Sequence, residues 1–317
     1  MPIGTALEGQ ESPAGAPPVL RGRRRWGEEA IRLVLFACAL LSMATTLAIV
    51  VSLLEPTLSF FGEVDLVEFL SGTIWSPLFA EPRFGVLPLV TATVLVTGIA
   101  LSVSIPLGLL TAVFLSEYSP RRLRAVLKPG LELLAGVPTV VYGFFALTFV
   151  TPLLQHLWLF GDPPGVFNAA SAGIVMGIMI VPTVASLSED AMGAVPQALR
   201  DGAYALGSSR LQVSTKVVVP AALSGIVAAI VLGVSRAVGE TMIVLIAAGG
   251  TPKLSFDPAD AMQTMTAFIA AAGIGDQPTG SIGYKTIFAV GSALFAATFV
   301  VNLVSIRLVR RFREVYE

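Results

Sequence analysis

Two charged residues lie inside an apolar run in the last third of the chain. Arg236 and Glu240 fall within residues 226–248, a stretch that is otherwise typical of a membrane span. A separation of four residues predicts that the two side chains share one face of a helix. A charge at the middle of a span costs about 2.5–3.5 kcal/mol on insertion scales. Such residues are therefore usually paired or face a water-filled path, and they are usually functional.

The arginine indicates that the ligand is an anion, because its planar fork of donors matches the oxygens of an oxyanion. Two roles are open to Glu240. It holds Arg236 until an anion displaces it, or it accepts a hydrogen bond from a protonated anion, and a carboxylate there repels fully ionised anions. The alternative is a structural ion pair that fixes helix register. Thr241, Thr139 and Tyr142 could line the same path, although hydroxyls in spans also bond their own helix.

The elements that position these residues are predicted to be membrane helices. Of the 317 residues, 55% are hydrophobic and only 13% are charged, and the mean hydropathy is +0.82. Soluble domains carry about 25% charged residues. The chain is therefore predicted to be an all-α integral membrane protein, because a single span satisfies its backbone only as a helix. Six runs reach the length of about 20 residues that a transmembrane helix needs: 31–54, 87–115, 131–154, 169–187, 226–248 and 286–306.

The distribution of Lys and Arg predicts the orientation of these spans. Sixteen basic residues fall on one side of the membrane and three on the other. The basic side is cytoplasmic, so both termini are predicted to be cytoplasmic. Four parts are predicted: a disordered tail over 1–29, a first helix with an outer segment over 30–86, a membrane core over 87–307 that contains an inner loop at 188–220, and a cytoplasmic tail over 308–317.

The inner loop is unusually polar for this chain. Residues 195–206 place apolar side chains at helical spacing, and Gly207 is suited to end that helix. A second short amphipathic piece, 209–219, leads to Pro220. The loop is either a surface helix on lipid headgroups or a helix offered to a soluble partner. The predicted apolar face consists of Val195, Leu199, Ala203 and Leu206.

Several function classes are excluded or disfavoured by residues that the chain lacks. There is one cysteine, Cys38, and one histidine, His156, so neither a disulfide framework nor a metal site is expected. No glycine-rich loop ending in Lys-Ser or Lys-Thr is present for a nucleotide phosphate. The net charge of −1 gives no basic field for nucleic acid. We therefore expect no enzyme activity and no cofactor on this chain.

The inner loop resembles the EAA loop of permeases in type I ABC importers. That family pattern has Glu-Ala-Ala, a glycine four residues after the last Ala, and a Leu-Pro-like ending. Here the matching residues are Asp201, Gly202, Ala203, Gly207 and Pro220. Asp replaces Glu and keeps the charge, while Gly replaces the first Ala and lowers helix propensity by about 1 kcal/mol.

Three further segments are similar to phosphate-specific permeases. Residues 131–145, LELLAGVPTVVYGFF, resemble the third-span signature, and residues 236–242, RAVGETM, resemble the fifth-span signature. Residues 280–289, GSIGYKTIFA, look like the PstC family and not its paralogue PstA. The resemblance covers residues 32–311.

This resemblance implies a MetI-like permease subunit for ATP-driven import of inorganic phosphate across the bacterial inner membrane. The family pairs PstC with PstA in the membrane, with two copies of the ATPase PstB inside and the phosphate-binding protein PstS outside. ATP and Mg would then be bound by the ATPase. The resemblance implies transport roles for Arg236 and Glu240 and an ATPase-coupling role for the 188–220 loop. The alternatives are a permease for another small oxyanion and a proton-coupled secondary transporter that uses Glu240, but internal repeats and further buried acids typical of the latter are not evident.

Overall fold

A computed structural model describes residues 26–79, 81–158 and 161–311. Most of the tail predicted over 1–29, and the end of the tail predicted over 308–317, lie outside these residues. The chain divides into two units, up to Val50 and from Val51 onward. What is described of the first unit is one helix, the initial part of α1 (Trp26–Phe61). Its side chains are apolar on all sides, which is typical of a helix surrounded by lipid.

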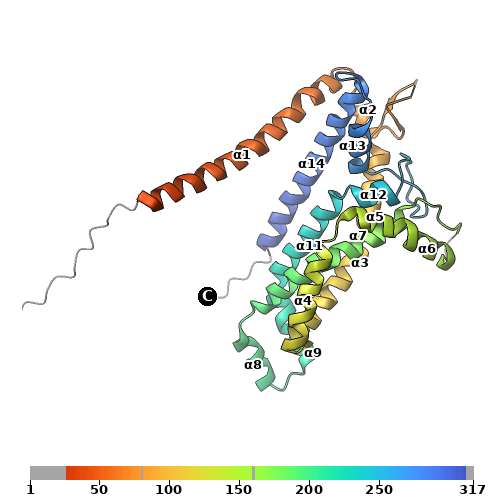
Figure 1. Cartoon of the computed structure of the whole chain (residues 1–317). Coiled ribbons are helices and arrows are strands. Elements are labelled where there is room, and N and C mark those ends of the chain that lie inside the picture. Colours follow the sequence, from red (N-terminus) through yellow and green to blue (C-terminus); the bar gives the residue numbers. More distant parts are fainter. Residues whose placement is uncertain (1–25, 80, 159–160, 312–317) are drawn as a thin grey trace, which may run out of the picture. The chain divides into compact units, whose positions relative to one another are not determined.

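The second unit is mainly helical (Figure 1). Its elements after α1 are α2 (Leu66–Ser71), β1 (Trp75–Ser76), β2 (Arg83–Phe84), α3 (Leu87–Val113), η1 (Phe114–Tyr118), α4 (Arg121–Ala135), α5 (Thr139–Phe145), η2 (Ala146–Val150), α6 (Thr151–Leu157), α7 (Ala169–Gly193), α8 (Gln197–Ala205), α9 (Arg210–Val213), η3 (Ser214–Val218), α10 (Val219–Ala221), α11 (Leu223–Val238), α12 (Met242–Ala247), α13 (Met265–Ile274) and α14 (Ile282–Arg311). The three η elements are single π-helical turns.

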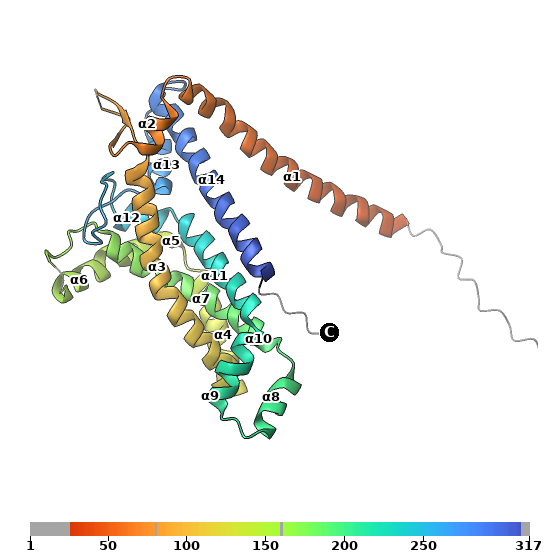
Figure 2. The ribbon, with the colours of Figure 1, turned by 180° about the vertical axis from the view of Figure 1, so that it is seen from behind.

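Helices α3 and α7 form the centre of this unit and lie side by side (Figure 2). Glycines on α7 permit the close approach. A Cβ added at Gly173 would lie 2.7 Å from the side chain of Ile99, and one at Gly177 would lie 2.7 Å from the carbonyl oxygen of Ala100. Small residues are the usual means by which membrane helices come this close. The other helices of this unit are arranged around this pair.

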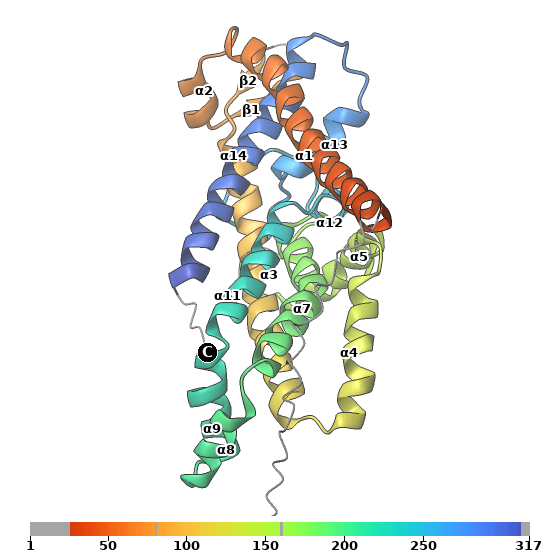
Figure 3. The same cartoon turned by 90° about the vertical axis from the view of Figure 1, so that its left-hand side faces the viewer.

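The third predicted span begins later than the sequence indicates. Residues 131–135 belong to α4, an amphipathic helix with no buried residue that lies beside α7 (Figure 3). The helix is interrupted at 136–138, and the apolar helix that is long enough to span the membrane runs over Thr139–Leu157. Pro138 explains the break, because proline lacks an N–H and disfavours helical backbone at the preceding residue.

The fifth predicted span is also interrupted. Helix α11 ends at Val238, and α12 starts at Met242 after a three-residue break. At its other end, the segment Arg210–Ala221 meets α11 at an angle of 72°. In the described part of the chain, five helices are long and apolar enough to cross a membrane, and six if this bent pair counts as one span. The last helix, α14, continues to Arg311, so the boundary predicted at 307 falls inside it.

The end of the unit opposite α8 contains a second apolar core. Strands β1 and β2 pair antiparallel with Trp75 opposite Phe84. Phe60, Phe69, Trp75 and Phe268 are all buried there, and the rings of Trp75 and Phe268 meet edge to face at 5.0 Å. This core fixes α13, a short apolar helix that precedes the last span.

Candidate functional site

Arg236 lies in the last turn of α11 and is half-buried. Its Nη1 donates a hydrogen bond to Thr183 Oγ1 of α7 at 3.0 Å. Its charge also interacts electrostatically with Tyr142 of α5. A cation is favourable near a helix C-terminus, where carbonyl groups lack partners. The guanidinium group therefore joins α11 to α7, with Tyr142 of α5 within the range of its charge.

Glu240 does not share the helical face of Arg236, so that prediction is wrong. Because α11 ends at Val238, Glu240 lies in the break and turns to the next helix. Its Oε1 accepts hydrogen bonds from the backbone N–H groups of Met242 at 3.0 Å and Ile243 at 3.3 Å. In the described structure the carboxylate caps α12 and forms no ion pair with Arg236.

Buried threonines surround this break. Thr266 Oγ1 donates to the carbonyl oxygen of Glu240 at 2.7 Å, and it also contacts Thr264 Oγ1 at 3.0 Å. From α3, Thr93 Oγ1 accepts the backbone N–H of Met265 at 3.0 Å. The broken span is therefore fastened to α13, and α13 to α3, through hydroxyl groups, which supply partners that a bilayer could not.

The other predicted path residues are placed by α5 and by the break. Tyr142 donates its hydroxyl to the carbonyl oxygen of Leu134 at 2.8 Å, which bridges α4 and α5. Thr139 begins α5 one turn earlier and is half-buried. Thr241 follows Glu240, and its hydroxyl donates to the carbonyl oxygen of Gly239 at 3.3 Å. Tyr142 is the member of this group that the structure brings to Arg236.

The loop over 188–220 contains α8, and this helix ends where the sequence predicts. Gly207 has φ of +83°, a left-handed conformation that favours glycine, and it directly follows the helix cap. Asp201 is exposed and accepts a hydrogen bond from Gln197 Nε2 at 3.0 Å. No atom lies within 4 Å of a Cβ added at Gly202. The acid and the glycine of the motif therefore face outward.

The predicted apolar face of this loop is only partly buried. Val195 is buried, and Ala203 packs against the same apolar cluster. Leu199 is exposed, and Leu206 is 89% exposed. Pro220 lies in α10, where the chain turns toward α11. Leu199 and Leu206 thus present apolar surface that the described residues do not cover.

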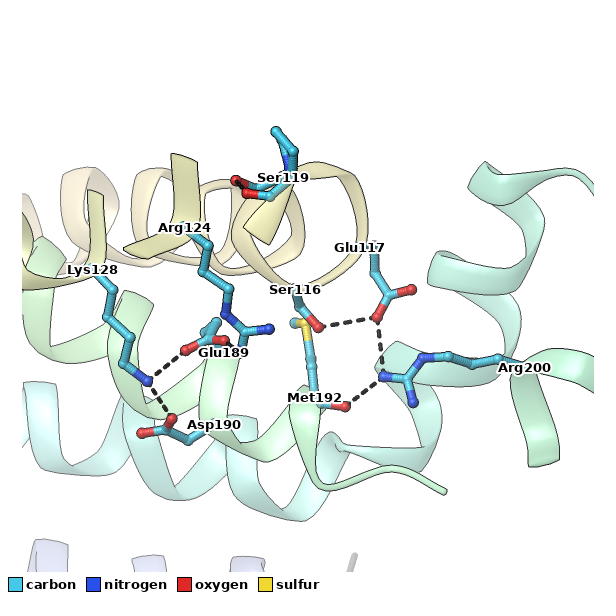
Figure 4. A network of polar contacts seen from close by, with 10 residues as sticks. Ser116, Glu117, Ser119, Arg124, Lys128, Glu189, Asp190, Met192 and Arg200 are labelled. Atoms are coloured by element: carbon cyan, nitrogen blue, oxygen red, sulfur yellow. Dashed lines mark hydrogen bonds and ion pairs between the residues drawn. The ribbon is translucent and has the colours of Figure 1, made fainter. Parts of the chain in front are cut away.

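Figure 4 shows buried charges near this loop. The sequence alone does not identify them. Glu189 is fully buried at the end of α7 and forms ion pairs with Arg124 and with Lys128, the latter at 2.7 Å. Glu117 of η1 pairs with Arg200 of α8 at 3.1 Å. The one available signal was an acid directly after an apolar run, since Glu189 lies two residues past the predicted end of the fourth span.

Comparison with known proteins identifies the kind of molecule that carries these features. Residues 104–314 match the family described as "Binding-protein-dependent transport system inner membrane component". The chain belongs to this family. It is a multi-pass inner-membrane permease of the ABC importer type, and the predicted MetI-like fold is confirmed.

Several relatives have similar sequences over most of their length. A probable ABC transporter permease protein, YqgH of Bacillus subtilis, is 37% identical over 88% of this chain and 90% of its own. The phosphate transport system permease protein PstC of Mesorhizobium japonicum is 32% identical over 77% of each chain. PstC 1 of Mycobacterium tuberculosis is 35% identical over 72% of this chain and 73% of its own. The similarity to PstC permeases is therefore confirmed.

Solved structures support the fold alone. The chain is similar to one from a bacterial alginate ABC transporter, with a TM-score of 0.63 and 16% identity over 93% of this chain and 100% of the other. It is also similar to a chain of the MetNI methionine ABC transporter in an inward-facing conformation, with a TM-score of 0.52 and 17% identity over 73% of this chain and 95% of the other.

Proposed function

We propose that this chain is a membrane-spanning subunit of an ATP-driven importer of inorganic phosphate, and that Arg236 binds the anion on its way through the membrane. The observation that carries the proposal is the position of this guanidinium group, which joins α11 to α7 beside a broken span and acts by its charge on Tyr142 of α5. Relatives named as phosphate permeases support the choice of anion.

The geometry suits a transient anion site. The hydrogen bond to Thr183 engages one nitrogen of Arg236, and a guanidinium has five N–H donors in a planar fork. A phosphate oxygen pair can therefore bind the remaining donors. The hydroxyl groups of Tyr142, Thr139 and Thr241 are proposed to line the same path.

Glu240 is proposed to act as a hinge and a filter in this path. Its Oε1 is engaged by two backbone N–H groups of α12, which argues against a role as the resting partner of Arg236. The other carboxylate oxygen can accept a hydrogen bond from a protonated phosphate, whereas sulfate, which carries no proton at neutral pH, meets repulsion.

The partners follow from the outward-facing residues of the loop. We infer that a cytoplasmic ATPase pair of the PstB type docks on α8, where Asp201 and Gly202 face outward and Leu206 offers exposed apolar surface. A paralogous permease of the PstA type would complete the path, and a PstS-type binding protein would deliver phosphate at the opposite end. ATP and Mg would be bound by the ATPase.

Reconstitution tests this function directly. Proteoliposomes that contain this chain, the second permease and the ATPase pair are expected to take up labelled phosphate when ATP is inside and the binding protein is outside. Sulfate is expected not to compete. Uptake that needs no ATPase but follows a proton gradient would instead support a secondary transporter, and preferential uptake of another oxyanion would correct the substrate.

A further inference from the structure

Arg200 is the residue directly before the Asp-Gly-Ala motif, and its side chain points away from the surface on which the motif lies. Its Nη2 donates to Glu117 Oε1 at 3.1 Å and to the carbonyl oxygen of Met192 at 2.7 Å, while Nη1 donates to the carbonyl oxygen of Val195 at 2.6 Å. Figure 4 shows the guanidinium between the carboxylate of Glu117 and the carbonyl oxygen of Met192. One side chain of α8 thus contacts both the end of α3, through η1, and the end of α7.

The surroundings make these contacts strong. The side chains of Arg200 and Glu117 are 11% and 5% exposed, so water cannot easily replace either partner. The last carbonyl groups of a helix have no partner within it, and at the end of α7 Arg200 adds a charged donor to the carbonyl oxygen of Met192, which also accepts the backbone N–H of Val195 at 3.2 Å. Ser116 Oγ adds a second donor to Glu117 Oε1 at 3.0 Å. Removing one member would leave buried polar groups unpaired, which costs far more than losing an exposed pair.

A second contact fastens the same loop to η1. The guanidinium of Arg210, in α9, lies 5.7 Å from the ring centroid of Tyr118, within the range of a cation–π interaction. Glu117 and Tyr118 both belong to η1, a π-helical turn, and such turns are frequent at functional sites. The loop is therefore held by charge at two points of one turn.

We propose that Arg200 is a positioning residue that transmits movement of α8 to the ends of α3 and α7 together. This inference rests on the proposed function, because it requires a motor docked on α8. Without the fork of Arg200, α8 would remain attached through its chain connections and through apolar contacts of Val195 and Ala203. The motor would still dock, but less of its movement would reach the spans.

A neighbouring ion pair provides a matched control. Lys128 of α4 binds Glu189 of α7 at 2.7 Å in the same region, yet it makes no contact with α8 among those described. Lys128→Met removes a cation from an ion pair whose acid is buried, and it leaves α8 untouched. Arg122→Met removes an exposed cation from the same helix. Neither change is expected to alter coupling in assembled transporter.

The test measures ATP hydrolysis and uptake of labelled phosphate in the same proteoliposomes, with the complete transporter and its binding protein. For Arg200→Met, the ATPase is expected to co-purify at the normal ratio, while ATP hydrolysed per phosphate imported rises at least about tenfold, since a buried charge-assisted contact is lost. Glu117→Gln is expected to act in the same direction, and the double variant to be no worse than Arg200→Met alone.

Where the unmodified transporter takes up phosphate, three results overturn the inference. The first is an unchanged ratio in assembled Arg200→Met transporter, and the second is an equal rise in Lys128→Met. The third applies if Arg200→Met fails to assemble. Glu117→Gln, which keeps both carbonyl contacts of Arg200, then replaces it, and an unchanged ratio of ATP hydrolysed to phosphate imported overturns the inference. Absence of phosphate uptake by the unmodified transporter contradicts the proposed function instead. In that case the role of Arg200 is tested by measuring how far the cognate binding protein stimulates ATP hydrolysis. Normal stimulation in Arg200→Met also overturns the inference.

Discussion

At the scale of single residues, the proposed anion site depends on the availability of the Arg236 side chain. Arg236→Gln is expected to reduce phosphate uptake at least about a hundredfold, because it removes both the charge and the fork. Arg236→Lys keeps the charge but loses the bidentate geometry, so an intermediate uptake is expected. Labelled-phosphate uptake in proteoliposomes measures both.

Co-purification of the second permease and the ATPase is the control for these two variants. Assembly is expected to be normal, since the guanidinium has one hydrogen-bonded side-chain partner in the structure, Thr183. Normal uptake by an assembled Arg236→Gln transporter would contradict an anion site at this residue.

Substitutions of Glu240 are expected to separate its structural effect, the cap on α12, from its effect on transport. Glu240→Gln retains an oxygen that can accept the two amide hydrogen bonds of α12, whereas Glu240→Ala leaves them without this partner. Loss of an N-terminal cap costs about 0.5–2 kcal/mol. In thermal unfolding of the purified complex, the alanine variant is therefore expected to be less stable than the glutamine variant. Equal stability would argue that the cap is not formed in the membrane.

At the scale of elements, the contact between α3 and α7 leaves no room for larger side chains. Gly177→Ala would place a methyl group 2.7 Å from the carbonyl oxygen of Ala100. Overpacking of this kind costs about 1–3 kcal/mol, so a lower unfolding temperature of the complex is expected.

The chain offers a matched glycine for this comparison. Gly98 of α3 has no atom within 4 Å of an added Cβ, and alanine has a higher helix propensity than glycine. Gly98→Ala is therefore expected to be neutral or slightly stabilising. A Gly177→Ala complex as stable as Gly98→Ala would refute the close packing of these helices.

Hydropathy predicts the spans well and their interruptions poorly, and the reason is physical. An apolar run of about 20 residues has few alternatives to a helix in a bilayer. Averaged over such a run, the hydropathy stays high through a break of three residues, so neither 136–138 nor 239–241 ends the signal. The break that contains Glu240 is stabilised by Thr266 of α13, 26 residues away. Partners so distant in sequence are not visible in local periodicity.

The same limit applies to the buried charges. Arg200 and Lys128 were counted only as signs of orientation, because each finds its acid on another element. Lys128 and Glu189 are 61 residues apart in the chain. By contrast, the end of α8 at Gly207 was predictable, since a glycine after an amphipathic helix is a local signal.

At the scale of the whole molecule, the orientation in the membrane remains a prediction that labelling can test. With Cys38 replaced by serine, a cysteine at Asp201, on the exposed side of α8, is expected to react with a membrane-impermeant maleimide only in inside-out vesicles. A cysteine at Phe256, which is 77% exposed and lies in the segment before α13, is expected to react only in right-side-out vesicles. The reverse pattern would invert the topology and the proposed side of ATPase docking.

The contacts of Arg200 also bear on whether such transporters are modular. A designer who exchanges 188–220 for the loop of another permease would transplant the surface on which the motor is proposed to dock but leave Glu117 behind on η1. Such a chimaera would recruit the donor's ATPase yet lack the pair that ties the new loop to the old spans. Interchangeable motors would therefore require residues 117 and 200 to be exchanged as a set, although they lie 83 positions apart.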